Sequence, residues 1–129
     1  MSEHPNAVMA QRTFAAWNAG HLDVIREVFS NDIILHFAGN NALSGAYRGH
    51  DAVMGALGRA FQVGGPRVEM ESLLASDAHV MAFFHAMGER DSTTLDVVLA
   101  MAIKVNAAGK MKEIWFLAND QPGYDRFWS

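Results

Sequence analysis

The chain has 129 residues, half of them apolar, which suffices to bury one core, so we expect a single domain over residues 1–129. A formal charge of −4 and an even scatter of ten Lys and Arg residues leave no basic patch, which argues against a nucleic-acid or membrane partner. Without cysteine there are no disulfides or thiolate metal sites, and no apolar run has the length of a membrane span, so we expect a cytoplasmic protein.

The first third of the chain has mostly helical spacing of its apolar residues. Residues 5–18 carry an imperfect helical stripe that ends at Ala19-Gly20, and residues 21–29 have the pattern of a second, short helix. Residues 33–37 follow a turn and predict the first strand. Residues 38–49 are rich in Gly, Asn and Ser and indicate a loop.

Helical spacing returns over residues 50–63 and stops at Gly64-Gly65-Pro66, which predicts a third helix. From residue 67 onward the apolar period is two, the period of strands. The predicted strands, joined by short polar turns, are residues 67–75, 79–89, 94–105 and 111–118. Three helices followed by an antiparallel meander predict an α+β fold, in which the helices pack on one face of a curved sheet.

Both faces of the predicted central strands are apolar. On the strand at residues 94–105, Leu99 and Met101 alternate with Ala100 and Ala102. An antiparallel sheet with helices on one face normally has polar residues on the other, so a second apolar face needs a cover. The tail at residues 119–129 is too short to provide it alone. We therefore expect a homodimer through the outer face of the sheet.

Three stretches of the sequence carry a family resemblance. They are Trp17-Asn18-Ala19-Gly20 with Leu22-Asp23 and Phe29, the loop at residues 43–53, and Ile114-Trp115 followed by Asp120-Gln121 and residues 125–129. With them the chain resembles SnoaL-like proteins of the nuclear transport factor 2-like superfamily, relatives of ketosteroid isomerases and polyketide cyclases. The resemblance implies a cone-shaped α+β fold, with three N-terminal helices on a curved, mainly antiparallel sheet. It also implies a cavity in which cofactor-free enzymes move protons on apolar carbonyl compounds.

The resemblance also assigns positions to candidate catalytic residues. His36 stands where ketosteroid isomerases carry their carboxylate base, and Thr13 and Met101 stand where those enzymes carry two oxyanion donors. Asp120, with Asn119 before it, lies within one residue of the acidic residue of polyketide cyclases, whose companion histidine falls near Met101. Both donors are thus replaced, so steroid-type isomerisation by the same groups is not expected.

The residues themselves leave two interpretations for each candidate. His36 can accept a proton near neutral pH if it faces the cavity, or it is a core histidine bonded to a backbone carbonyl. Asp120 can act as an acid or base beside an apolar wall, or it forms a turn in Asn-Asp-Gln-Pro-Gly. His85, on a neighbouring strand, approaches the site or is a satisfied core residue.

The remaining candidates are ligand-binding residues, several of which core packing explains equally well. The predicted ligand-binding set is Phe14, Trp17, Tyr47, Phe61, Phe83, His85, Met101, Trp115 and Asn119. Tyr47, in the loop after the first strand, has a phenol that can reach a ligand carbonyl. The six histidines have no metal-ligand spacing and no phosphate-binding or dinucleotide motif is present, so we expect neither a metal nor a cofactor.

Two functions follow from the sequence. The first is a cofactor-independent isomerase, cyclase, hydratase or lyase that uses Asp120, His36 or both on a small apolar ligand. The alternative is a non-catalytic ligand-binding or accessory dimeric module of the same fold. A cavity whose walls hold neither a carboxylate nor an imidazole would exclude acid–base catalysis of the first kind.

Overall fold

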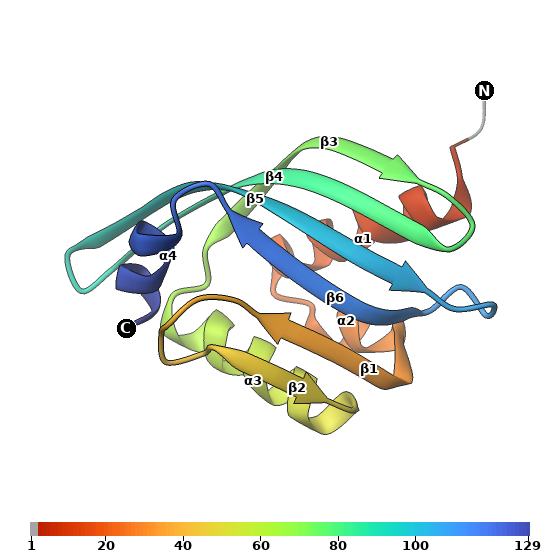
Figure 1. Ribbon diagram of the computed structural model, residues 1–129, viewed down its shortest axis with the longest axis horizontal. Coiled ribbons are helices and arrows are strands. Elements are labelled where there is room, and N and C mark those ends of the chain that lie inside the picture. Colours follow the sequence, from red (N-terminus) through yellow and green to blue (C-terminus); the bar gives the residue numbers. More distant parts are fainter. Residues whose placement is uncertain (1–2) are drawn as a thin grey trace.

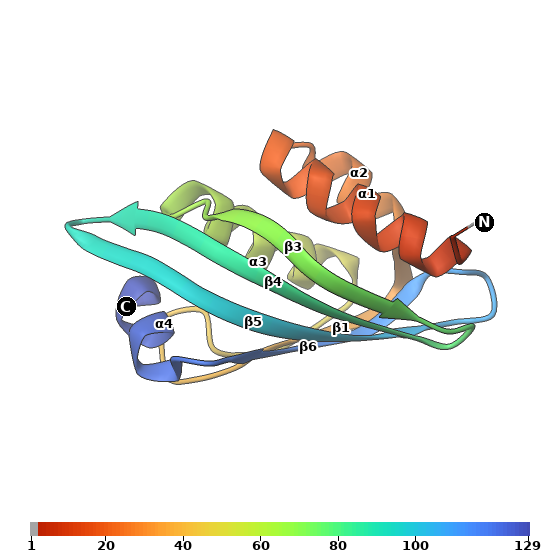
Figure 2. The same cartoon turned by 90° about the horizontal axis from the view of Figure 1, so that it is seen from above.

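The computed structural model describes residues 3–129, which form a curved six-stranded sheet with helices α1, α2 and α3 on one side (Figure 1, Figure 2). The elements are α1 Pro5–Ala19, α2 Leu22–Glu27, β1 Phe29–Phe37, β2 Gly45–Arg48, α3 His50–Val63, β3 Arg67–Ala75, β4 His79–Arg90, β5 Thr93–Val105, β6 Met111–Ala118 and α4 Gln121–Trp128. The strand order is β2-β1-β6-β5-β4-β3. All neighbouring strands are antiparallel except β1 and β6, which are parallel, so the α+β fold has a mixed sheet.

The ends of α1 and α3 follow the signals in the sequence. His4 caps α1 because its side chain accepts a hydrogen bond from the backbone N–H of Asn6, and Pro5 occupies the first turn. Gly20 ends α1 in the left-handed conformation, with φ of 77°. No helix among residues 3–129 is long and apolar enough to cross a membrane.

Three elements differ from the sequence-based expectation. β1 begins at Phe29 rather than Ile33, because the Met111 N–H donates to the Val28 carbonyl and draws this segment into the sheet beside β6. β2 lies inside the predicted loop and pairs with residues 34–37 at the edge of the sheet. α4 occupies the predicted tail. For β1 the contact with β6 is distant in sequence, whereas β2 pairs with the neighbouring β1 and α4 begins at its own local cap, Asp120.

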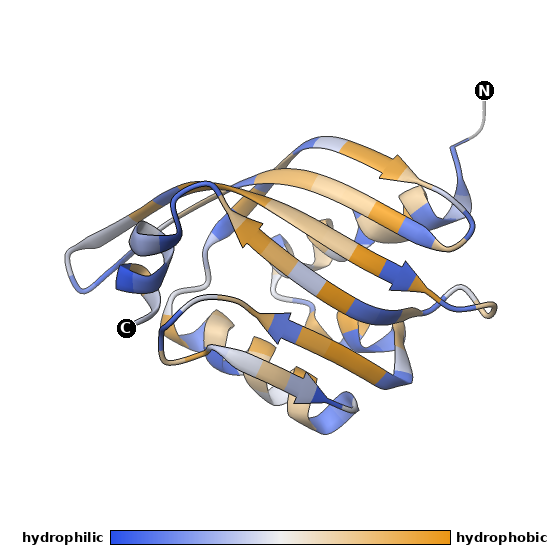
Figure 3. Ribbon diagram, viewed as in Figure 1, coloured by the Kyte–Doolittle hydropathy of each residue, from blue (hydrophilic) through white to orange (hydrophobic). Residues whose placement is uncertain are grey.

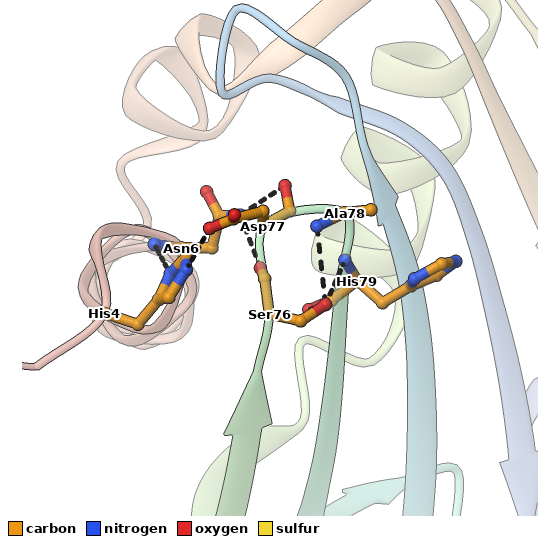
Figure 4. A network of polar contacts seen from close by, with 6 residues as sticks. All are labelled: His4, Asn6, Ser76, Asp77, Ala78 and His79. Atoms are coloured by element: carbon orange, nitrogen blue, oxygen red, sulfur yellow. Dashed lines mark hydrogen bonds and ion pairs between the residues drawn. The ribbon is translucent and has the colours of Figure 1, made fainter.

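The N-terminus of α1 is fixed to the turn between β3 and β4, as Figure 4 shows. His4 Nε2 lies 2.8 Å from Asp77 Oδ1, and Asn6 Nδ2 donates to the Ser76 carbonyl at 2.9 Å. The backbone N–H of His79 donates to the Ser76 hydroxyl at 3.1 Å within the same turn. At the other end of α1, the Asn18 side-chain amide exchanges two hydrogen bonds with the backbone of Val68, so both ends of edge strand β3 are paired.

Helix α4 lies at one end of the sheet, at the left in Figures 1 and 2. Its N-cap is Asp120, whose Oδ1 accepts from the Gly123 N–H at 3.0 Å. Arg90, at the end of β4, donates to the carbonyls of Phe127 and Ser129. Asp125 accepts hydrogen bonds from the Asn41 side chain, the Asn40 N–H and the Gln121 side chain. These contacts join α4 to the sheet and to the loop after β1.

These hydrogen bonds lower the pKa of Asp125, the one from Asn41 having the largest effect. A carboxyl with a lowered folded-state pKa stabilises the fold above its ordinary pKa of 3.8, and that contribution is lost as the pH falls through the folded value. We therefore predict that Asp125→Asn lowers the free energy of unfolding at pH 7 and that its difference from the native chain shrinks below pH 3.8. Urea unfolding between pH 7 and pH 2.5 tests this.

Asp91→Asn is the matched control, because the Asp91 carboxylate is 90% exposed and its charged neighbour within residues 3–129 is Arg90, at 4.0 Å. Its free energy of unfolding should equal that of the native chain throughout the pH range. The prediction is wrong if the free energy of unfolding of Asp125→Asn stays below that of the native chain by the same amount down to the lowest pH. The hydrogen bonds would then not depend on the charge of the Asp125 carboxylate.

Candidate functional site

A cavity of about 110 Å³ lies between the inner face of the sheet and the helices. One water molecule needs roughly 10–15 Å³ by the same kind of measure, so the space is large enough for a small organic molecule. Twenty of the described residues line it: Thr13, Phe14, Trp17, Ile25, Phe29, Leu35, Phe37, Leu57, Ala60, Pro66, Val68, Phe84, Ala86, Leu95, Leu99, Met101, Ile114, Phe116, Tyr124 and Trp128. They come from every helix and from all strands except β2.

Aromatic rings form much of the cavity wall. The Phe84 ring centroid lies 4.9 Å from that of Phe14 and 6.4 Å from that of Phe116. Phe37 lies 6.3 Å from Phe116 and 5.8 Å from Tyr124. Tilted, edge-on and stacked ring pairs at these distances are favourable, so the rings hold one another in place around the cavity. The wall is therefore apolar and packed by its own rings.

Few polar atoms belong to the lining residues. The Thr13 hydroxyl donates to the Met9 carbonyl at 2.8 Å, and the Trp17 indole N–H donates to the Pro66 carbonyl at 2.7 Å. The indole nitrogen of Trp128 is buried and has no hydrogen-bond partner among residues 3–129. Burial raises the pKa of Tyr124 far above its ordinary value, so this phenol stays neutral. None of the lining residues in the described chain is a carboxylate, an imidazole or a cation.

His36 lies on the face of the sheet opposite to the cavity. Its neighbours Leu35 and Phe37 line the cavity, and successive side chains of a strand point to opposite faces. On the outer face its Nε2 lies 2.7 Å from Glu113 Oε2, and its ring stacks on Trp115 at 5.2 Å with an interplanar angle of 5°. His36 therefore has its polar and aromatic partners outside the cone.

Asp120 does not line the cavity either. It is exposed and caps α4. This role is close to the turn-forming interpretation of Asp120, because its carboxylate accepts a backbone hydrogen bond where the helix begins. Asn119 terminates β6, where its Oδ1 accepts from the Val98 N–H at 3.0 Å. The structure thus does not bring His36 and Asp120 together in one cavity, because one faces out from the sheet and the other closes a backbone turn.

His85, Phe83 and Trp115 also face outward, because the alternate residues Phe84, Ala86, Ile114 and Phe116 take the inner positions. His85 contacts the Asp96 carboxylate on the neighbouring strand. The Asp96 carboxylate raises the pKa of His85, and the more distant Glu71 and Glu69 add to this rise while desolvation opposes it. These three predicted binding residues therefore belong to the outer surface.

Tyr47 and Phe61 pack near the cavity but do not line it. The Tyr47 hydroxyl donates to the Leu43 carbonyl at 2.8 Å and accepts from Arg59 at 3.3 Å. The Phe61 ring lies edge-on to Trp17, with centroids 5.6 Å apart, and so supports a lining residue from behind. Local hydrogen bonding and aromatic packing account for both positions.

Of the predicted ligand-binding residues, Phe14, Trp17 and Met101 line the cavity. The sequence-based selection missed Tyr124 and Trp128, the aromatic residues that α4 adds to the wall. A signal for them was present, since an Asp N-cap and a proline in the first turn precede aromatic residues spaced four apart, which is one helical face. No group of three or more His, Cys, Asp or Glu residues suited to a metal ion occurs within residues 3–129.

Comparison with known proteins agrees with this architecture. The SnoaL-like domain family matches residues 10–114. Uncharacterized protein Rv0034 of Mycobacterium tuberculosis (strain ATCC 25618 / H37Rv) is 29% identical over 132 residues, covering 100% of both chains. The structure of Bal32a from a soil-derived mobile gene cassette superposes with a TM-score of 0.91 at 23% identity, over 97% of each chain.

A second similar structure is Rv0760c from Mycobacterium tuberculosis in complex with estradiol-17β-hemisuccinate. It has a TM-score of 0.77 at 16% identity and covers 91% of this chain and 95% of that one. At such identities the two structural likenesses establish the fold. Because the family match extends over most of the sequence and the fold agrees with it, the chain belongs to the SnoaL-like family of the nuclear transport factor 2-like superfamily.

Proposed function

We propose that the protein binds a compact apolar small molecule in the cavity between the sheet and the helices, without acid–base catalysis by the cavity wall. The observation that carries this proposal is the chemistry of the lining, which is aromatic and aliphatic and holds no carboxylate or imidazole among the described residues. Burial of apolar ligand surface supplies the binding free energy at roughly 25 cal/mol per Å² of apolar surface removed from water, less the cost of immobilising the ligand.

The enzymatic alternative lacks its reacting groups in this cavity. A general base must reach the proton that it removes, either directly or through one water molecule. His36 is separated from the cavity by the sheet, and Asp120 uses its carboxylate as a helix cap. Rv0760c, whose fold is similar, is known in complex with estradiol-17β-hemisuccinate, which supports a binding role for a protein of this fold.

The first test of the binding role uses 2-ethylnaphthalene, an apolar probe without hydrogen-bonding groups. We predict saturable 1:1 binding with a negative heat-capacity change, measured by calorimetric titration at several temperatures. Ala86→Ile adds carbon atoms to the cavity wall and should weaken binding about tenfold or more, because a well-packed wall cannot absorb the extra volume. His36→Gln and Asp120→Asn should leave the dissociation constant unchanged.

Ala46→Ile is the control for Ala86→Ile, since Ala46 is exposed on β2 and does not line the cavity. It should bind the probe like the native chain. Absence of saturable binding up to the solubility limit of the probe, or equal binding by Ala86→Ile, would overturn the proposed function. If the native chain turns over a carbonyl substrate and both His36→Gln and Asp120→Asn lose this activity, the enzymatic alternative is supported.

We also infer a homodimer through the outer face of the sheet. This face carries exposed apolar side chains on β3, β4 and β6: Leu74 at 66% exposure, Met81 at 37%, Phe83 at 39% and Leu117 at 70%, with the half-buried Trp115 beside them. Figure 3 shows hydrophobic segments along the central strands. A contiguous apolar surface of this kind favours burial against a second copy, because two-fold pairing covers both faces at once.

Sedimentation equilibrium tests the dimer. The native chain should have twice the monomer mass at micromolar concentration, and Leu117→Glu should be monomeric because it places a charge in the apolar face. Val63→Glu is the control, since Val63 is an exposed apolar residue at the end of α3 and lies on a helix rather than on the sheet. A native monomer, or a Leu117→Glu dimer of unchanged affinity, would contradict the inferred interface.

A further inference from the structure

The cavity wall formed by α4 contains one hydroxyl, that of Tyr124. Tyr124 is only 5% exposed and lines the cavity between Phe37 and Trp128. Burial raises the pKa of this phenol, and the effect outweighs the opposing influence of the Trp128 indole N–H beside it. The hydroxyl is therefore protonated at any physiological pH and acts as a donor.

The second donor in this wall is the indole N–H of Trp128. Trp128 is 3% exposed, and its ring centroid lies 6.1 Å from that of Tyr124. Although the N–H lies beside the Tyr124 hydroxyl, it is outside hydrogen-bonding geometry and has no acceptor among residues 3–129. Buried donors nearly always have a partner, and leaving one unpaired costs free energy.

The other lining residues have few polar atoms that could pair with these two donors. The Trp17 N–H and the Thr13 hydroxyl already donate to the backbone carbonyls of Pro66 and Met9. All other lining side chains are apolar. Tyr124 and Trp128 are one helical turn apart on α4, so both donors belong to the same end of the cavity.

Building on the proposed function, we propose that Tyr124 and Trp128 form the polar end of the cavity, where the Tyr124 hydroxyl donates to an acceptor-only oxygen of the ligand, such as that of a ketone, ester or ether. The Trp128 indole nitrogen has almost no accessible surface, so a ligand oxygen does not reach it directly. A carboxylate does not fit, because no lining residue of the described chain carries a positive charge. The Tyr124 hydroxyl makes the polar contact, and the Trp128 ring packs beside Tyr124 and positions it.

The test compares two probes of nearly equal shape, 2-acetylnaphthalene and 2-ethylnaphthalene, in the native chain and in Tyr124→Phe. The ratio of their dissociation constants isolates the contribution of the carbonyl oxygen. We expect Tyr124→Phe to shift this ratio about tenfold against the ketone, while the affinity for the hydrocarbon stays the same or rises. Tyr47→Phe is the matched control, since the Tyr47 hydroxyl donates to the Leu43 carbonyl and Tyr47 does not line the cavity.

The infrared carbonyl band of bound 2-acetylnaphthalene gives a second readout that a purely structural role would not move. It should lie at lower wavenumber in the native chain than in a hydrocarbon solvent and shift back in Tyr124→Phe and, partly, in Trp128→Phe. If a variant does not fold, the wavenumber of the carbonyl band in the native chain, compared with that in a hydrocarbon solvent, still tests the proposal.

Two negative results are distinguishable. If neither probe binds the native chain, the proposed function itself fails. If both probes bind but the ratio is the same in Tyr124→Phe and the native carbonyl band is unshifted, apolar binding stands and the assignment of Tyr124 and Trp128 is overturned.

Discussion

The alternation of side chains along the paired central strands is the constraint on which the rest of this structure depends. β4 and β5 pair over their whole lengths, and β5 pairs with β6, so the inward or outward position of one residue fixes that of its partners. Phe84, Leu99 and Phe116 face the cavity, and their neighbours Phe83, Ala100 and Leu117 face out. A slip of one residue would exchange the two surfaces completely.

The two surfaces have different chemistry even though both are rich in apolar residues. The inner one is lined by rings and aliphatic side chains, with its few donors at Thr13, Trp17 and α4. The outer one mixes apolar side chains with paired charges, including His36 with Glu113 and His85 with Asp96. His36 and His85 therefore lie on the face for which we propose a dimer interface, Asp120 caps α4, and the cavity wall has no carboxylate or imidazole among the described residues.

Much of this arrangement is predictable from the sequence because it depends on periodicity. The spacing of apolar residues indicated α1, α3 and the strands from residue 67 onward, and Gly20 and Gly64 marked helix ends. Alternation also placed His36 opposite to Leu35 and Phe37. It did not say which face was the inner one, because a strand that is apolar on both faces gives the same pattern either way.

The parts that the sequence analysis did not predict are β2 and α4, whose segments have the composition of loops and turns. Gly45 and Ala46 give β2 no strand pattern, and it forms because β1 offers an edge. The segment at residues 119–123 has turn composition, yet Asp120 uses that chemistry to cap a helix. Because the sequence-based prediction did not include α4, it did not assign Tyr124 and Trp128 to the cavity wall. The proposed polar end of the cavity was therefore not predicted.

The lining of the cavity extends from Thr13 to Trp128, so its walls come from opposite ends of the described chain. Contacts this far apart in sequence carry a high loop-closure cost, which slows folding. A chain without α4 would lack Tyr124 and Trp128 in its cavity wall. Detachment of α4 from the folded chain would release the two carbonyls bound by Arg90 and expose Tyr124, Phe127 and Trp128, each at most 5% exposed, so hydrogen exchange of the α4 amides reports how often this end of the cavity opens.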